Sequence, residues 1–513
     1  MSPSRLSEYA SNTVPYASNA LHVLIAGAGL GGIMMGVMLE RAGISYQILE
    51  RSEEVRSIGC AISIGPTVMR VMGQLGLMGE LFKESIPIRQ IRYFDRMEGD
   101  LELDQCDGIA DMMFCETRYG NAIRVISRTT FYNMLYSRVP PHKILFGKRI
   151  IRTQEHDSDT GGFGGDKGDT SNDSGFVSCF CDDGTEYRGT ILIGADGVYS
   201  AVRQQMYQAL ENLGEMDKNK APLMPHQHCV VGITQPLDPK EFEILGNKYG
   251  EFQVIRGMDQ IRSIWLMPLT NYRIAWTLFC YLPKDFRQEF NNMNQNSSLS
   301  PLGSQSNHEK WHALSKKVHA QAQALLENIR DVRNPMSNAK GVFRGLLDKT
   351  QPKAISKVMV NQGVCYRWYH SRTVLIGDAC HQSLPHGGQG ASQAILDSIF
   401  LASKLHALVS SPSATCAEKP RIRRSEITNI FAQYYEERRD VATFAKVGSG
   451  WFDNIFGGEG WGAKMVRFCY FWLMPPAMFY QISDLFFRTR PLLPFLPSVR
   501  STGCVAARTF LGT

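Results

Sequence analysis

Residues 21–32 read LHVLIAGAGLGG, a strand pattern that runs directly into a glycine-rich turn. The first part, Leu21–Ala26, is an apolar run that predicts a buried strand, and the spacing G-x-G-x-x-G follows at once. Apolar residues then recur at helical spacing, and Ser45–Leu49 predicts a second strand that ends in Glu50. Strand, glycine turn, helix, strand and acidic residue in this order are typical of a βαβ unit that binds a dinucleotide.

The glycines and the glutamate of this unit have separate physical tasks. Gly27 and Gly29 allow a tight turn and a close approach of the backbone to a pyrophosphate, and Gly32 allows the helix to pack on the strand. Glu50 follows the second strand, where a carboxylate accepts hydrogen bonds from both hydroxyls of an adenosine ribose. A 2′-phosphate would meet that carboxylate, so the pattern favours FAD or NAD over NADP. The alternative is a tight turn that holds no ligand.

A second strand pattern, Thr373–Asp378, also leads into a glycine-rich turn. The turn Gly388–Ala391 precedes Ala394–Leu408, which has helical spacing. Its unpaired backbone N–H groups would lie at the positive end of a helix dipole and could stabilise negative charge on a bound cofactor. Asp378 could hold a polyol hydroxyl. Such turns also occur in α/β proteins that bind other ligands, so this motif depends on the others.

Two further positions suit a cofactor site. The strand pattern Thr190–Ile193 ends in Gly194-Ala195-Asp196-Gly197, with Arg203 a short way on. Arg128 lies in the first turn of a predicted helix, where a cation opposes the helix dipole unless it meets a phosphate.

Composition limits the class of protein. The chain has 513 residues, of which 43% are hydrophobic, enough for more than one domain. The net charge is +6, but basic residues are scattered and no nucleic-acid-binding run is apparent. Twelve cysteines without a CxxC pair or a secretory signal predict reduced thiols in an intracellular protein. Cys179 and Cys181 alternate in a strand pattern, so we interpret them as packed thiols and assign no metal.

The three strand-end motifs together closely resemble the group A flavoprotein monooxygenases, single-component FAD enzymes of the p-hydroxybenzoate hydroxylase fold. The resemblance covers roughly residues 20–408, and within the family the pattern is most like fungal secondary-metabolite monooxygenases and epoxidases. It implies an α/β fold with a Rossmann-type FAD-binding domain, an inserted, mainly antiparallel substrate-domain sheet and a helical, apolar C-terminal region. The residues that it places at FAD are Gly27, Gly29, Gly32, Glu50, Gly59, Ala61, Arg128, Asp196, Asp378, Gly390 and Ala391.

These features predict a division of the chain. Residues 1–19 are expected to be a flexible lead-in. The FAD-binding domain is expected over 20–92, 120–205 and 357–409, and the substrate domain over 93–119 and 222–350. The segment 426–513 is predicted to be helical.

The activity that the resemblance implies is an NAD(P)H- and O₂-dependent oxygenation. NADPH or NADH would reduce FAD, and a flavin hydroperoxide would hydroxylate or epoxidise a lipophilic aromatic, isoprenoid or polyketide molecule. Arg203 matches a family position and is a candidate catalytic residue, although it could equally brace Asp196. His381 and His386 are candidate proton donors, although a histidine in a polar loop is more often only hydrogen-bonded. The alternatives are an FAD-dependent reductase or dehydrogenase, and a non-catalytic, membrane-tethered flavin-binding protein.

The segment 466–497 presents a separate question. Phe468–Phe487 is twenty residues long with Asp484 as its only charge, a length that could span a bilayer. Pro475 and Pro476 interrupt it, and its aromatic residues suit a membrane interface. Monotopic membrane attachment and packing as a lid or dimer surface are the two interpretations. The oligomeric state stays open.

Overall fold

The computed structural model describes most of the chain and resolves it into two large sheets with helices around them. The described residues are 21–55, 60–95, 106–156, 175–216, 223–258, 261–282, 286, 288–289, 305–338, 341–410 and 422–509, with the backbone alone at 257–258, 305–315 and 319. The predicted lead-in 1–19 and Gly59 lie outside them.

The first sheet is the predicted dinucleotide-binding sheet. Its six strands run in the order β17, β18, β11, β1, β2, β7, and all neighbours are parallel except β17 and β18. The strands are β17 Tyr369–His370, β18 Thr373–Leu375, β11 Ile191–Gly194, β1 His22–Ala26, β2 Ser45–Leu49 and β7 Ile144–Leu145. Parallel strands align their carboxyl ends, so this order brings the three glycine-containing motifs to one edge of the sheet.

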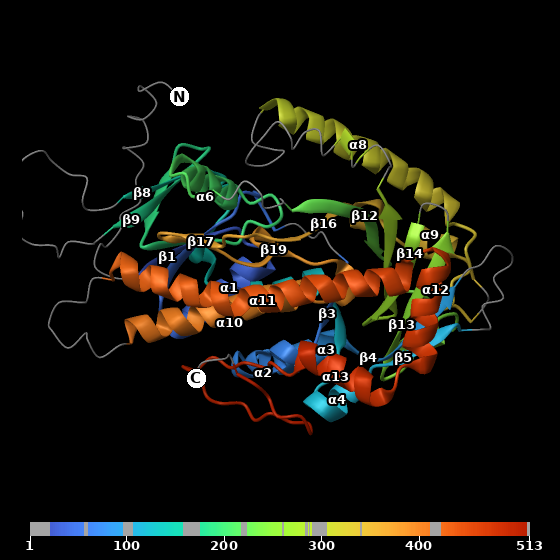
Figure 1. Ribbon diagram of the computed structural model, residues 1–513. Coiled ribbons are helices and arrows are strands. Elements are labelled where there is room, and N and C mark those ends of the chain that lie inside the picture. The colour runs from blue at the N-terminus through green and yellow to red at the C-terminus, as the bar shows by residue number, and fades with distance from the viewer. Residues whose placement is uncertain are drawn as a thin grey trace, which may run out of the picture.

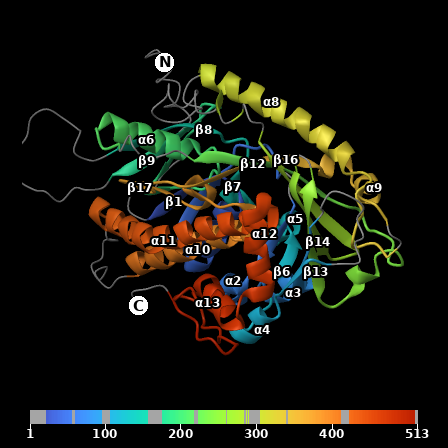
Figure 2. The same cartoon turned by 45° about the vertical axis from the view of Figure 1, so that its right-hand side comes forward.

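The helices of this half belong to one hydrophobic core with the parallel sheet. In both views α10 and α11 lie side by side, and α1 packs on α10 (Figures 1 and 2). The helices are α1 Leu30–Ala42, α2 Pro66–Gln74, α3 Met78–Glu84, α5 Arg128–Tyr136, α6 Ala201–Asn212, α10 Gly390–Val409 and α11 Arg424–Gly457. A small antiparallel sheet lies beside α6 and consists of β8 Ile150–His156, β9 Phe176–Cys181 and β10 Glu186–Gly189.

The second sheet has ten strands and is mainly antiparallel, as predicted for the substrate domain. Its order is β19, β16, β12, β15, β14, β13, β4, β6, β3, with β5 paired to β4, and only β13 and β4 run parallel. The strands are β3 Ala61–Ile64, β4 Ile86–Asp95, β5 Gly108–Asp111, β6 Arg124–Ser127, β12 Met224–Ile233, β13 Gly250–Met258, β14 Ile261–Leu269, β15 Arg273–Tyr281, β16 Ser356–Val364 and β19 His381–Gln382.

The two faces of this sheet are covered differently. On one face, apolar residues of α8 (Gln305–Asn328) and α9 (Phe343–Asp348) join a separate core with the strands. The other face packs against the C-terminal end of α11 and bounds a cavity. The strands β3, β6 and β16 fall in ranges predicted for the FAD-binding domain but pair in this sheet, so the predicted boundaries stay a prediction.

The C-terminal region is helical, as predicted. A helix α12 (Gly460–Phe468), a π-helical turn at Cys469–Leu473 and a helix α13 (Pro476–Phe487) follow α11, and α13 lies beside α4 (Phe114–Tyr119) (Figure 1). Proline at 475 and 476 separates the last two helices. No helix among the described residues combines the length and the hydropathy that crossing a bilayer requires.

Candidate functional site

The turn between β1 and α1 accepts only glycine at two of its predicted positions. Gly27 has φ +97°, and a Cβ there would lie 2.7 Å from the carbonyl oxygen of Ala195. A Cβ on Gly32 would lie 2.0 Å from the carbonyl oxygen of Gly27. Both distances are below van der Waals contact, so the turn can pass close to Ala195 and pack against the first turn of α1 only because both side chains are absent.

The same turn leaves room beside Gly29 and is held by Glu50. A Cβ on Gly29 would meet nothing nearer than the Ala195 carbonyl oxygen at 4.0 Å. The Glu50 carboxylate accepts hydrogen bonds from the backbone N–H of Ala28 at 2.7 Å and of Ser52 at 2.8 Å. An acidic side chain fixed beside a glycine turn fits the ribose and pyrophosphate of a dinucleotide, which is the arrangement that the sequence predicts.

Asp196 lies at the end of β11 and keeps one unsatisfied oxygen. Its Oδ2 accepts a hydrogen bond from the Val202 N–H at 3.1 Å, while Oδ1 is buried and has no hydrogen-bond partner among the described residues. Burial raises the pKa of this carboxyl. A buried, unpartnered acceptor is costly, so the oxygen is suited to a bound hydroxyl or water.

Arg203 is committed to two backbone carbonyls. Its guanidinium donates to Ala379 O at 2.6 Å and to Val198 O at 2.8 Å, which joins the loop after β11 to the loop after β18. It does not line the cavity described below. This geometry supports a bracing role for the loop that carries Asp196, and the catalytic role stays a prediction.

Asp378 and the turn before α10 face the same space. Asp378 follows Gly377, whose φ is +57°, and is exposed toward the cavity. Although the side chain opens on the cavity, the protein packed around it removes water and raises the pKa of Asp378, an effect opposed by His381 and Arg128. Gly388 has φ +61° and α10 begins at Gly390, where an added Cβ would meet nothing within 4 Å. Four backbone N–H groups at the start of α10 lack helical partners, so the turn can accept an electron-rich group.

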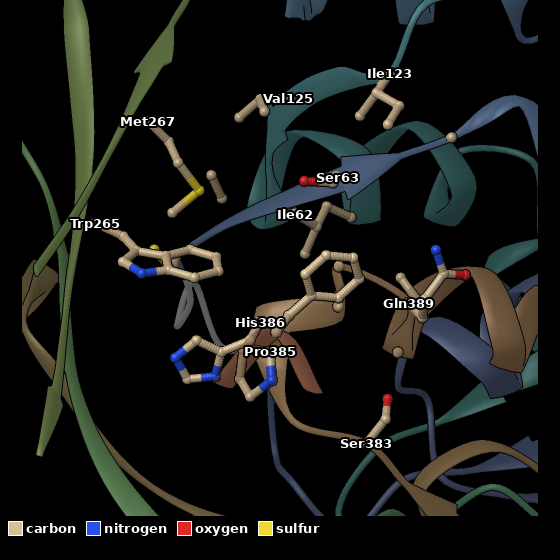
Figure 3. A pocket seen from close by; sticks show the side chains of 18 of the residues that line it. Ile62, Ser63, Ile123, Val125, Trp265, Met267, Ser383, Pro385, His386 and Gln389 are labelled. Atoms are coloured by element: carbon tan, nitrogen blue, oxygen red, sulfur yellow. The ribbon is translucent and has the colours of Figure 1, made fainter. Parts of the chain in front are cut away.

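One cavity of about 570 Å³ joins these motifs to the second sheet. On the first side it is lined by Gly29, Ala61, Arg128, Asp378, Gly390 and Ala391, all of them predicted cofactor residues. In Figure 3, Trp265 and Met267 of β14 lie on one side of the cavity and Gln389 lies on the other, with Ile62 and Ser63 of β3 and Pro385 between them. Gly27, Gly32, Glu50 and Asp196 do not line it; they support its first side.

The wall away from the glycine turns is apolar and comes from two parts of the chain. Strand residues include Ile88, Val231, Phe252, Trp265, Met267 and Phe279. C-terminal residues include Phe452, Tyr470, Met474, Phe479, Ile482 and Phe486. The sequence predicted an antiparallel substrate-domain sheet and left packing of 466–497 as a lid among its two interpretations, but it did not show which C-terminal residues would line the cavity.

Two charged clusters beside the cavity were also missed. His381 Nε2 lies 2.7 Å from Asp397 Oδ2, and Arg438 Nε donates to Asp397 Oδ1 at 2.8 Å. Burial alone would raise the pKa of Asp397, but His381 and Arg438 hold it below its usual value. Cys380, His381 and Asp397 could together approach a metal ion, but the Arg438 cation already neutralises this carboxylate. We therefore interpret Cys380, His381 and Asp397 as a structural group and not as a metal site.

The second cluster surrounds His386. Its buried ring lies between Trp265 and Phe279, at centroid distances of 4.9 and 4.2 Å, and Nδ1 lies 3.5 Å from Asp453 Oδ1. Asp453 accepts a hydrogen bond from Arg262 at 2.8 Å. Burial lowers the pKa of His386 to about 4, so the ring is neutral near pH 7. His386 thus presents no cation to the cavity, and proton donation by either histidine stays a prediction.

Comparison with known proteins agrees with this geometry. A family model described as an FAD binding domain matches residues 20–414. The FAD-dependent monooxygenase ptmM of Penicillium ochrochloron is 26% identical over 424 residues, covering 81% of this chain and 84% of that protein. The FAD-dependent monooxygenase ctvC of Aspergillus terreus is 23% identical over 451 residues, covering 86% and 80%.

Solved structures share the fold. Klebsiella pneumoniae HpxO complexed with FAD and uric acid superposes with a TM-score of 0.61 at 17% identity, covering 92% of this chain and 98% of that one. Pseudomonas aeruginosa PqsL in complex with 2-aminobenzoylacetate gives a TM-score of 0.57 at 16% identity, covering 85% and 96%.

Fold and site together define a flavoprotein oxidoreductase. The chain belongs to the FAD-binding domain family, and the predicted resemblance to the group A monooxygenases is confirmed. It is an FAD-dependent monooxygenase, and the relatives named above are FAD-dependent monooxygenases of fungi.

Proposed function

We propose that this enzyme uses NADH or NADPH and O₂ to hydroxylate or epoxidise a lipophilic small molecule. The observation that carries the proposal is the cavity that joins the glycine turns to an apolar wall. A cofactor held at the turns would face a substrate held against the sheet without an intervening polar layer. Isoprenoid, polyketide and aromatic molecules suit such a wall because burying apolar surface drives their binding.

The residues fit FAD on three counts. Gly29 leaves open space for a pyrophosphate, Glu50 is fixed beside it, and the start of α10 offers unpaired N–H groups at the cavity. When bound, FAD supplies the redox and oxygen-activating chemistry. We assign Glu50 to the ribose, Asp378 to the polyol chain and Arg128 to a phosphate. Gly59 lies outside the described residues, so its assignment stays a prediction. Ala61 lines the cavity.

The protein's own contribution is positioning and exclusion of water. The apolar side chains of β13, β14 and β15 and of the C-terminal helices surround the substrate side, and few polar groups would hold solvent there. Excluding water limits loss of activated oxygen as H₂O₂. The nature of the oxygenated intermediate and the choice between NADH and NADPH stay predictions.

The test begins with the visible spectrum of the purified protein. We expect a flavin spectrum that bleaches on anaerobic addition of NADPH or NADH and returns when oxygen is admitted. A colourless protein that FAD cannot reconstitute would contradict the proposal. Bleaching without any oxygenated product from lipophilic phenols and isoprenoids would support the reductase alternative, and bound FAD that neither nicotinamide reduces would support the scaffold.

A variant at Gly390 tests whether flavin reduction depends on the turn at the start of α10. Gly390→Asp places a carboxylate in the first turn of α10, facing the cavity, where it repels negative charge on the cofactor. We expect flavin reduction to slow at least ~10-fold, which corresponds to ~1.4 kcal/mol. Gly79→Asp is the matched control, because it also adds an acid to a helix first turn where a Cβ meets nothing within 4 Å. Equal effects of both variants would remove the turn from the site.

A further inference from the structure

The helices that wall the cavity also carry a large exposed apolar surface. Eight side chains of this stretch are large, hydrophobic and exposed, and Trp461 and Trp472 reach 77% and 68% exposure. We call the set the C-terminal apolar surface: Trp461, Met465, Val466, Phe468, Trp472, Leu473, Met478 and Leu485. Monomeric proteins rarely expose so many large apolar groups in one segment, so the surface indicates a partner.

The spacing of these residues separates an outer and an inner face. Trp461, Met465 and Phe468 recur at i, i+4 and i+7, which places them on one side of α12. On α13, Met478 and Leu485 are exposed at i and i+7, while Phe479, Ile482 and Phe486 occupy the adjoining sector of the same helix and line the cavity. The segment is therefore apolar on both faces, and only the inner one is covered by protein.

Basic side chains predominate at the surface beside these apolar residues. Between residues 459 and 488, all of which the structure describes, the exposed charged side chains are Lys464, Arg488 and, at the start of α12, Glu459. Arg467 is buried, and Asp484 accepts hydrogen bonds from Arg118 and Tyr119. A second copy related by a two-fold axis would bring like charges together, whereas anionic lipid headgroups complement them.

We propose that the C-terminal apolar surface binds in the plane of an anionic bilayer, with Trp461 and Trp472 as the membrane-interface anchors. Tryptophans with aliphatic neighbours and a cationic rim are the composition of interfacial helices. Resting on the proposed function, the same contact would let a lipophilic substrate pass from lipid to the cavity along the wall to which Tyr470, Met474 and α13 contribute.

The test measures vesicle binding of the purified holoprotein, with no turnover involved. Two kinds of vesicle are used, one of phosphatidylcholine alone and one that also contains phosphatidylserine. Sedimentation with each is compared for the native protein and Trp461→Ser/Trp472→Ser. We expect the double variant to bind at least ~10-fold more weakly. Leu213→Ser/Phe82→Ser is the matched control, because these side chains are 61% and 44% exposed and lie elsewhere; its binding should equal that of the native protein. Lys464→Glu/Arg488→Glu should reduce binding to phosphatidylserine vesicles and leave phosphatidylcholine binding unchanged.

Three outcomes would overturn the proposal. The native protein could fail to sediment with either vesicle, the tryptophan variant could bind as well as the native protein, or the tryptophan variant could convert a dimer to a monomer in light scattering. The last outcome would assign the surface to a second copy. Because flavin reduction and oxygenation are measured separately, failure of vesicle binding leaves the proposed monooxygenase function intact.

Discussion

Asp397 of α10 and Arg438 of α11 form an ion pair of 2.8 Å with side-chain exposures of 0% and 1%. The same carboxylate accepts the Gly377 N–H at 2.8 Å, immediately before Asp378. The pair therefore holds α11 against α10 and fixes the turn that carries a predicted cofactor residue.

Replacing Arg438 by methionine should destabilise the protein strongly. The variant leaves Asp397 buried without its cation, and breaking one partner of a buried ion pair costs about 3–5 kcal/mol. Urea denaturation of the holoprotein measures the change. Arg439→Met on the same helix removes an exposed arginine and should change stability by less than about 0.5 kcal/mol. Similar losses for the two variants would show that the ion pair contributes little.

His386 should make stability depend on pH in a defined window. Its pKa is about 4 in the folded protein and near 6.5 when unfolded, so the unfolded chain binds more protons between these values. The contribution of neutral His386 to the free energy of unfolding is complete above pH 6.5. It is lost as pH falls toward 4, at up to about 1.4 kcal/mol per pH unit. His386→Gln should flatten this limb in urea midpoints measured from pH 4 to pH 7. An unchanged slope would show that another group titrates.

Gly32→Ala should abolish FAD retention. The added methyl would lie 2.0 Å from the Gly27 carbonyl oxygen, so the β1–α1 turn must move away from the position a pyrophosphate requires. The ratio of flavin to protein absorbance measures retention, which we expect to fall at least ~10-fold. Gly79→Ala, where a Cβ meets nothing within 4 Å, should retain full flavin and gain helix propensity. Normal flavin content in Gly32→Ala would contradict the assigned turn.

Asp484→Asn should loosen α13 without unfolding the protein. Asp484 accepts hydrogen bonds from Arg118 and from the Tyr119 hydroxyl, which tie α13 to α4. Hydrogen bonds to charged groups contribute about 1.5–3 kcal/mol, so α13 should open more often. Hydrogen exchange of residues 476–487 should accelerate, and less product should form per NAD(P)H oxidised. Asp440→Asn on the exposed face of α11 should leave exchange unchanged.

Local patterns were sufficient to predict the dinucleotide unit. A strand is expected at Leu21–Ala26 and is found at His22–Ala26, and the second strand Ser45–Leu49 agrees residue for residue. The helix expected at Ala394–Leu408 extends over Gly390–Val409. These elements are specified by glycine positions and by apolar periodicity within one stretch of chain, which is information that a single sequence contains.

Features that depend on distant contacts could not be predicted. Arg438 resembles its exposed neighbour Arg439 in sequence, and only the packing of α11 on α10 buries it beside Asp397. Phe468–Phe487 is apolar on all sides, so periodicity could not tell its cavity face from its exposed face. The two interpretations of that segment concern different faces of the same helices.

Gln74 and Leu493 are 419 residues apart in the sequence but are hydrogen-bonded to each other in the structure. The Gln74 side chain of α2 donates to the carbonyl oxygens of Leu493, Leu496 and Pro497 and accepts the Leu493 N–H, and Leu493 is fully buried in the core that contains β1. During synthesis, α2 emerges from the ribosome long before residues 493–497, which bind Gln74, are made. We therefore expect the nucleotide-binding half to complete its core only after the C-terminal segment is made, and a chain shortened before residue 493 to expose apolar surface of this core.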